Sequence, residues 1–313
     1  MALRVVLIGA TGVFGSRIAS QLAGDPRFQL VVAGRRAQSL AALRDALGDA
    51  SVQLAVLDVA APGLADALAA LRPQLVIHAA GPFQQRDYRV AEACLACASD
   101  YIDLADGRDF VGGMSRLDDR AREAGRLLVS GASTVPALSS AVVDDLLPRF
   151  ATLDVIEHAI SPGNRTPRGD ATVAAILGYC GRPVQLWRDG RWRRGHGWML
   201  TRRPRFTFGP RWVGLCDVPD LALFPLRYPG VRTVIFRAGA GAEAPALRHA
   251  GRGVAGAAGT AARPGPPRHA PAPDQRVVPR RGQRRGRHAG GTGWARRARA
   301  GAEVALVVVR RCR

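Results

Sequence analysis

Short apolar runs alternate with amphipathic stretches over the first half of the chain. The apolar runs predict six buried strands at Arg4–Ile8, Gln29–Ala33, Val52–Leu57, Leu75–His78, Tyr101–Asp103 and Leu127–Val129. The stretches between and after them predict helices at Val13–Leu22, Ala37–Leu47, Leu64–Leu71, Tyr88–Ala98, Ser115–Ala124 and Ala137–Leu147, with a loop at Gly131–Pro136. Alternating strands and helices are typical of a doubly wound parallel sheet. We therefore predict one α/β domain over residues 1–150.

From about Leu153 the pattern changes. Strands are predicted at Val155–Ser161, Val184–Trp187, Arg191–Arg193 and Thr233–Phe236, with one helix at Ala171–Tyr179. Four tryptophans fall in this part, and we interpret them as core or domain-interface residues. The pattern predicts a smaller α+β domain over residues 151–237, and a homodimer through this domain is a further hypothesis.

After Phe236 the composition shifts to Gly, Ala, Pro and Arg, and neither apolar period persists. Such a segment buries too little apolar surface to offset its ordering entropy, so residues 238–313 are predicted to be mostly disordered. Because Gly241–Leu247 can be back-translated so that a shifted frame reads as an amphipathic helix, a frame-shifted tail is one hypothesis. A basic RNA-binding tail is the alternative, although the tail holds only one Phe, Trp or Tyr residue (Trp294) and shows no aromatic or Gly-Arg-Gly periodicity.

The net charge of +20 is concentrated in that tail. Residues 238–313 hold 16 Arg and three acidic residues, which leaves +7 for the other 237 residues. The folded part is therefore not predicted to bind nucleic acid. The five Cys lack a disulfide framework, and no apolar run approaches the ~20 residues of a membrane span. We expect a soluble, cytoplasmic protein without membrane contact.

The first predicted strand runs directly into a glycine loop. Its residues are Gly9, Ala10, Thr11, Gly12, Val13, Phe14 and Gly15. In a strand–turn–helix context the first glycine allows a tight turn, the second lets the backbone approach a pyrophosphate, and the third lets helix and strand pack closely. The helix N-terminus then offers free N–H groups to the phosphates. This pattern predicts a dinucleotide site.

The second strand is followed by Arg35 and Arg36. An NAD enzyme places an acidic residue here for the ribose 2′-hydroxyl, whereas Arg favours a 2′-phosphate. The two guanidinium groups predict NADP(H), with NAD(H) the less favoured cofactor; a solvated basic turn is the alternative. Asp58, after the third strand, is a candidate adenine contact or turn cap.

The fourth strand ends in small residues that leave room for a flat cofactor, Ala80, Gly81, Pro82 and Phe83. His78, just before them, is interpreted as a core or strand-end histidine.

The glycine loop, the Gly81-Pro82-Phe83 segment followed by Tyr88, the run Asp100–Leu104 and the segment Gly131–Pro136 together resemble the saccharopine dehydrogenase-like family over residues 1–236. This resemblance implies a Rossmann domain, an inserted α+β domain and a C-terminal helix that returns to the first domain. It also implies hydride transfer with NAD(P). The atypical tail stands where that returning helix is expected, which puts the activity of this chain in doubt.

The chain contains no Lys, which excludes the Tyr–Lys pair of short-chain dehydrogenases and Schiff-base chemistry on a protein lysine. The candidate proton donors are therefore Tyr88, Asp103, Asp106 and His196, each with a competing structural role. Arg165 and Arg168 are candidate clamps for a substrate carboxylate. Cys94 and Cys97 have metal-site spacing but lack a second ligand pair, so no metal is expected.

We predict an NADP(H)-dependent oxidoreductase that moves hydride to or from a C=O, C=N or C=C carbon of a small organic substrate in the cleft between the domains. A non-catalytic NADP(H)-binding sensor and an inactive truncated product are the alternatives.

Overall fold

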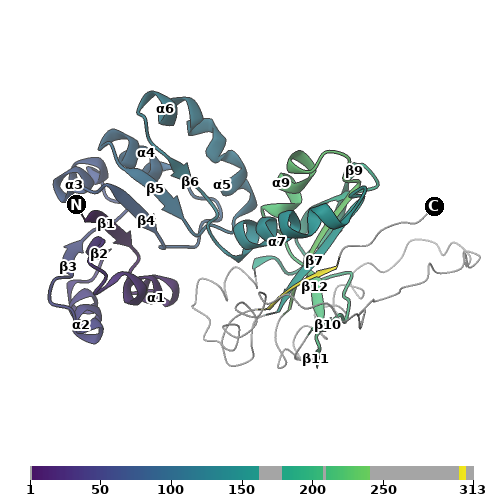
Figure 1. Ribbon diagram of the computed structural model, residues 1–313, viewed down its shortest axis with the longest axis horizontal. Helices are drawn as coiled ribbons and strands as arrows, with labels where there is room; N and C mark the ends of the chain where they lie inside the picture. Colours follow the sequence, from purple (N-terminus) through teal and green to yellow (C-terminus); the bar gives the residue numbers. More distant parts are fainter. Residues whose placement is uncertain (1, 162–177, 207–208, 240–302, 308–313) are drawn as a thin grey trace, which may run out of the picture.

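Six parallel strands form the sheet of the first domain, in the order β3-β2-β1-β4-β5-β6 (Figure 1). The computed structural model describes residues 2–161, 178–206 and 209–239, together with the backbone of 303–307. The strands are β1 (Leu3–Ile8), β2 (Phe28–Gly34), β3 (Gln53–Val56), β4 (Leu75–His78), β5 (Asp100–Asp103) and β6 (Leu128–Val129). This order confirms the doubly wound sheet, and its switch point lies between β1 and β4.

The helices of this domain follow the predicted order with one addition. They are α1 (Val13–Leu22), α2 (Ala37–Leu47), α3 (Leu64–Leu71), α4 (Arg89–Ala96), α5 (Arg108–Gly113) and α6 (Asp118–Glu123). The last predicted helix, α7 (Ser139–Leu146), packs instead on the second domain, where Val143 joins the core of Ile156 and Phe224. The prediction missed α5. The expected helix at Ser115–Ala124 is a 3₁₀ turn, Met114–Leu117, followed by α6. The predicted loop is wrong from Thr134 onward, because Thr134–Leu138 forms a helical turn interrupted at Val135.

Alternate residues of the central strands point to opposite faces of the sheet and form two separate apolar clusters. On one face of the sheet Val6, Ile8 and Val76 pack with Leu68 of α3 and Cys94 of α4. On the other face the cluster is formed by Leu7, Leu30 and Val32 with Ala19 of α1 and Leu40 of α2. Burial on both faces explains why these strands read as continuous apolar runs.

The second domain is built on a mixed sheet of order β14-β7-β13-β8-β9, with β12 paired to β13. Its strands are β7 (Val155–Ser161), β8 (Pro183–Arg188), β9 (Arg191–His196), β12 (Val213–Leu215), β13 (Thr233–Gly239) and β14 (Glu303–Val307), and a small separate pair consists of β10 (Arg205–Phe206) and β11 (Gly209–Pro210). Helix α9 (Asp220–Arg227) covers one face through Leu221 and Phe224, which pack on Ile156, Val234 and Phe236. This confirms a smaller α+β domain, although the sequence did not predict α9.

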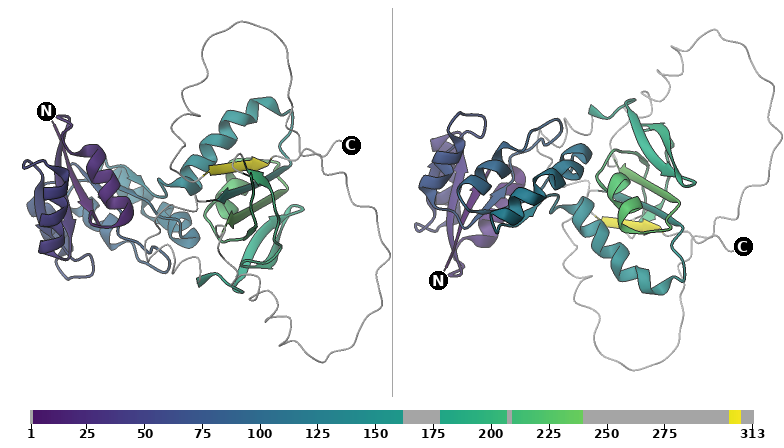
Figure 2. Two further views of the ribbon diagram at one scale, coloured as in Figure 1. Left: turned by 90° about the horizontal axis from the view of Figure 1, so that it is seen from below. Right: turned by 90° about the horizontal axis from the view of Figure 1, so that it is seen from above.

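The predicted tail is described only in part. Ala238 and Gly239 extend β13, and Glu303–Val307 forms β14, which pairs antiparallel with β7 and lies beside it in both views of Figure 2. Residues 240–302 and 308–313 lie outside the described residues, so the expected disorder stays a prediction there. The helix expected at Ala171–Tyr179 and the candidates Arg165 and Arg168 also fall largely or wholly outside them. No helix in the described part of the chain is long and apolar enough to cross a membrane.

Candidate functional site

Gly9, in the turn between β1 and α1, and Gly15, in the first turn of α1, occupy positions that no other residue fits. Gly9 has a φ of +79°, and a Cβ there would lie 2.7 Å from the backbone nitrogen of Ala80 on the neighbouring strand connection. A Cβ on Gly15 would lie 2.1 Å from the carbonyl oxygen of Gly9. Gly9 therefore makes the turn possible, and Gly15 lets α1 approach β1.

Gly12 differs, because it keeps space open rather than relieving a clash. It caps α1 in an extended conformation, and a Cβ there would meet only the Gly9 carbonyl, at 3.3 Å. The first-turn amides of α1 have no intrahelical partner, and no acidic side chain stands in that turn. Thr11 and Phe14 beside it are exposed, whereas Ala10 is buried under the turn. Free amides, a positive helix end and open space above Gly12 fit a pyrophosphate.

Arg35 and Arg36 lie at the end of β2, next to this turn. Their strand is joined to the loop because the amides of Gly9 and Ala10 both donate to the carbonyl of Ala33. Both arginine side chains are exposed, and neither guanidinium group pairs with a described residue. The Asp58 side chain accepts the amide of Ala60 at 2.9 Å, so it caps the turn after β3 and keeps one oxygen free. Two unpaired guanidinium groups fit a 2′-phosphate.

The end of β4 gives a flat rim with a buried histidine beneath it. Ala80 is partly buried, Gly81 and Pro82 are exposed, and the buried Phe83 ring meets the His78 ring edge-on at 5.0 Å. His78 Nδ1 lies 3.1 Å from the Tyr101 hydroxyl. Burial lowers the pKa of His78 to about 4, and Arg86 adds to this effect. His78 is therefore a neutral core residue at neutral pH, as its pattern predicted.

Two of the candidate proton donors are engaged in holding the backbone. Asp103 is fully buried, and its Oδ1 accepts the amides of Ala105 and Gly131 and the hydroxyl of Ser130 at 2.8–3.0 Å. Burial raises its pKa. The Tyr88 hydroxyl donates to the carbonyl of Phe110 at 2.9 Å and so fixes α5. This geometry fits structural roles for both residues.

Asp106 is an exposed candidate whose hydrogen-bond partner, Gln84, reaches towards the second domain. Gln84 donates to its Oδ1 at 3.0 Å, and the same Gln84 nitrogen lies 3.5 Å from the hydroxyl of Tyr179. Partial desolvation by the surrounding protein raises the pKa of Asp106, and the hydrogen bond from Gln84 opposes that rise. Since Gln84 directly follows Phe83, this carboxyl lies beside the rim at the end of β4.

Arg108, the first residue of α5, joins the two domains next to Asp106. Its Nη1 donates to the Gln185 carbonyl at 2.8 Å and to Asp217 Oδ1 at 3.1 Å, and its guanidinium carbon lies 5.1 Å from the centre of the Trp192 ring. Burial raises the pKa of Asp217, and Arg108 opposes that rise. Helix α5 also packs against α9. The domains are thus held together where the carboxyl ends of the parallel strands point.

The structure brings together some predicted residues and leaves others apart. His196 lies exposed at the end of β9, and no contact within the described part of the chain joins it to Asp106. Gln84, Arg108, Tyr179 and Asp217 were missed. Gln84 and Arg108 flank motifs that were recognised, but their partners are about 80 to 110 residues away in sequence, so only the fold reveals them. Within the described residues, no group of three or more potential metal ligands gathers.

Comparisons with known proteins agree with this geometry. Residues 5–129 match the family model of the saccharopine dehydrogenase NADP binding domain. A protein of Mycobacterium tuberculosis provisionally named a trans-acting enoyl reductase is 39% identical over 105 residues, and the trans-acting enoyl reductase of Mycobacterium ulcerans is 34% identical over 103. Each match covers 32% of this chain and 24% of the relative, so only about a quarter of the length of these curated relatives is matched.

Among solved structures, apo saccharopine dehydrogenase (L-Glu forming) from Saccharomyces cerevisiae is similar with a TM-score of 0.58 and 15% identity, over 76% of this chain and 55% of the yeast chain. Homospermidine synthase from Legionella pneumophila, solved with NAD, has a TM-score of 0.54 and 10% identity, over 82% and 69% of the two chains. These likenesses show a shared fold that extends over both domains. Residues 5–129 of this chain therefore match the saccharopine dehydrogenase NADP binding domain, and the chain shares its fold with saccharopine dehydrogenase over 76% of its length.

Proposed function

We propose that this protein is an NADPH-dependent reductase acting on a small organic substrate held where the two domains meet. The observation that carries the proposal is the open glycine turn at the N-terminus of α1 with the unpaired Arg35 and Arg36 beside it. Of the C=C, C=N and C=O substrates considered, the names of the mycobacterial relatives favour an activated C=C bond.

The residues divide the binding of the cofactor between them. The first-turn amides of α1 bind the pyrophosphate, Arg35 and Arg36 bind the 2′-phosphate, and the rim from Ala80 to Phe83 supports the ring. When bound, NADPH supplies the hydride, which adds to one carbon of the double bond. The neighbouring carbon must then take a proton.

Asp106 is the proposed proton donor. Gln84 donates to Oδ1, which leaves Oδ2 to carry the proton, and the raised pKa increases the protonated fraction above that of an ordinary carboxyl. Arg108 and Asp217 position this residue by fixing the start of α5 against the second domain. After transfer, the carboxylate regains a proton from solvent, to which its side chain is open.

Turnover of NADPH with an α,β-unsaturated thioester, a ketone and an imine tests this proposal. For Asp106→Asn we expect kcat to fall about 10²- to 10⁴-fold, the usual contribution of a general acid, with little change in NADPH affinity. In the wild type, kcat should decrease as pH rises through the elevated pKa of Asp106.

Asp109→Asn is the matched control, because it removes an exposed carboxylate one turn along the same segment. Equal losses in both variants, or a pH profile unchanged by Asp106→Asn, would remove Asp106 from the mechanism. Tight NADPH binding without turnover of any substrate class would instead favour a cofactor-binding sensor.

A further inference from the structure

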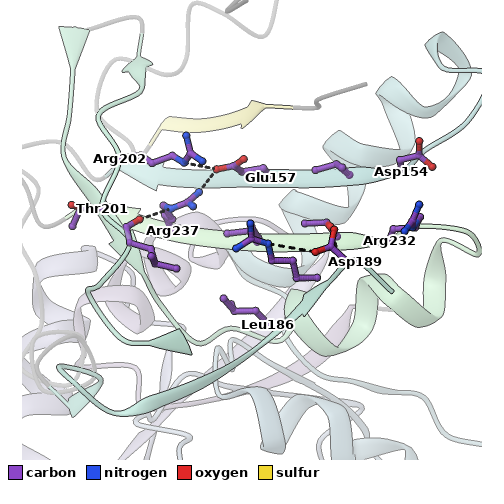
Figure 3. Close-up of a pocket in the computed structure, with 13 residues that line it drawn as sticks. Asp154, Glu157, Leu186, Asp189, Thr201, Arg202, Arg232 and Arg237 are labelled. Carbon is purple, nitrogen blue, oxygen red and sulfur yellow. Dashed lines mark hydrogen bonds and ion pairs between the residues drawn. The ribbon is translucent and has the colours of Figure 1, made fainter. Parts of the chain in front are cut away.

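A pocket of about 410 Å³ lies on the second domain, on the face of the sheet opposite α9 (Figure 3). Its floor consists of side chains from β7 and β13 that alternate with the core residues, namely Val155, Glu157, Ile235 and Arg237. Because α9 packs on the other face and contacts α5, this pocket is separate from the junction between the domains. Its volume is within the range of small-molecule sites, roughly 300–1,000 Å³.

The floor of the pocket holds a buried arginine. Arg237 is 4% exposed, its Nη1 pairs with Glu157, and its Nε donates to the Leu200 carbonyl at 3.1 Å. Burying a guanidinium group costs free energy unless it is paired, and burial lowers the pKa of Arg237. The side chain is therefore fixed in place at the bottom of the pocket.

The same carboxylate also serves a second arginine. Arg202 Nε lies 3.4 Å from the Glu157 oxygen that Arg237 uses, and Figure 3 marks both ion pairs of Glu157 with dashed lines. Arg188, also in the lining, adds to the positive potential at Arg237. Its Nε is 3.9 Å from Asp189, which is too long for a hydrogen bond. The lining holds four Arg (Arg188, Arg202, Arg232 and Arg237) and three carboxylates (Asp154, Glu157 and Asp189), so it carries one excess positive charge.

The wider charge distribution has the same sign. Residues 178–239 contain twelve Arg and three Asp, whereas the rest of the chain before the tail carries slightly more acidic than basic residues. A surface of one sign raises the local concentration of oppositely charged ligands. The apolar side chains Val155, Leu186 and Ile235 add a lining suited to a carbon skeleton.

We propose that this pocket binds a small organic molecule bearing carboxylate or phosphate groups, as a second ligand site apart from the cofactor. Arg202 and Arg188 bind the acidic groups, and Arg237 supplies a fixed positive charge beneath them. Glu157 holds Arg237 in place and limits the affinity, because it competes with the ligand for the same guanidinium groups.

Calorimetric titration of the full chain with succinate and with inorganic phosphate tests the site, in a buffer free of other multivalent anions. We expect Arg202→Gln and Arg188→Gln each to weaken binding about tenfold, the value of a charge-assisted hydrogen bond. Arg191→Gln is the matched control: it removes an exposed Arg of β9 outside the pocket and should change affinity less than about twofold. Glu157→Gln should tighten binding, provided that a melting curve shows it folded.

Saturating NADPH should leave the anion affinity unchanged. Preference for succinate or for phosphate identifies which acidic group the pocket accepts, and either result supports the site. The proposal is overturned if NADPH displaces the anion, since the anion then occupies the cofactor phosphate site. It is also overturned if Arg191→Gln weakens binding as much as Arg202→Gln, or if neither probe binds at millimolar concentration.

Discussion

The three glycines of the cofactor loop contribute in different ways, which single substitutions separate. Gly15→Ala places a methyl group 2.1 Å from the Gly9 carbonyl, so we expect a loss of about 3 kcal/mol or more in the free energy of unfolding. Gly12→Ala meets one atom at 3.3 Å and should cost only about 1 kcal/mol, as a less suitable cap. Its methyl group would occupy the space proposed for the cofactor pyrophosphate, so the affinity for NADPH should fall at least about tenfold.

Denaturation in urea and NADPH titration of the two variants measure these effects. If Gly12→Ala bound NADPH as the wild type does, the pyrophosphate would not lie over this turn. If Gly15→Ala were as stable as the wild type, the close approach of α1 to β1 would be wrong.

His78 makes stability depend on pH. Its folded-state pKa of about 4 lies below the ordinary value of 6.5, so the unfolded chain binds a proton between these limits while the folded chain does not. The stability that His78 contributes is therefore complete above pH 6.5 and is lost as pH falls towards 4, by up to about 3 kcal/mol.

His78→Gln keeps a partner for the Tyr101 hydroxyl and removes the titration. We expect its free energy of unfolding to change less between pH 7 and pH 4.5 than that of the wild type. Parallel pH dependence in the two proteins would show that His78 titrates normally in the folded state.

The turn, the helix start and the strand end that we propose for the cofactor could be located from the sequence because each lies within a short segment. The roles of Asp103 and Tyr88 could not. Asp103 accepts hydrogen bonds from the amides of Ala105 and Gly131, and the Tyr88 hydroxyl donates one to the carbonyl of Phe110. These hydrogen bonds depend on how β5, β6 and α5 pack, which the sequence pattern does not show.

At the scale of elements, α1 and α2 were predicted with their observed bounds, because a ten- or eleven-residue helix shows its periodicity. Helix α5 has six residues and ends in Gly112-Gly113, and α9 has eight and contains Pro225. Because glycine and proline both disfavour helix formation, α5 and α9 form only through their tertiary packing, which the sequence pattern does not reveal.

These two missed helices form the contact between the domains, which a double-mutant cycle tests. Arg108 and Asp217 have side chains only 12% and 25% exposed, so we expect Arg108→Ala and Asp217→Ala to couple by about 1 kcal/mol in unfolding free energy. The exposed pair Arg122 and Asp118 of α6 is the control and should couple by about 0.3–0.5 kcal/mol. Coupling no larger at Arg108 than at Arg122 would mean that this ion pair does not hold the domains together.

At the scale of the whole molecule, the charge is unevenly distributed between the two domains. Residues 1–237 carry a net charge of +7, and the second domain accounts for it, because residues 178–239 contain twelve Arg and three Asp. Only the arrangement of β7, β8 and β13 shows that several of these arginines line one pocket. A homodimer through the second domain stays a prediction, to be measured by sedimentation.

We propose that the first domain binds NADPH through the glycine turn and through Arg35 and Arg36, which directly follow β2. Fluorescence titration of the full chain with NADPH and NADH tests it most directly. We expect NADPH to bind at least about tenfold more tightly, because a 2′-phosphate gains charge-assisted hydrogen bonds. Arg35→Asp/Arg36→Ala should abolish that preference, while Arg72→Ala, which removes an exposed Arg between α3 and the start of β4, should keep it. Equal affinity for both cofactors, or a preference unchanged by the double substitution, would contradict the account.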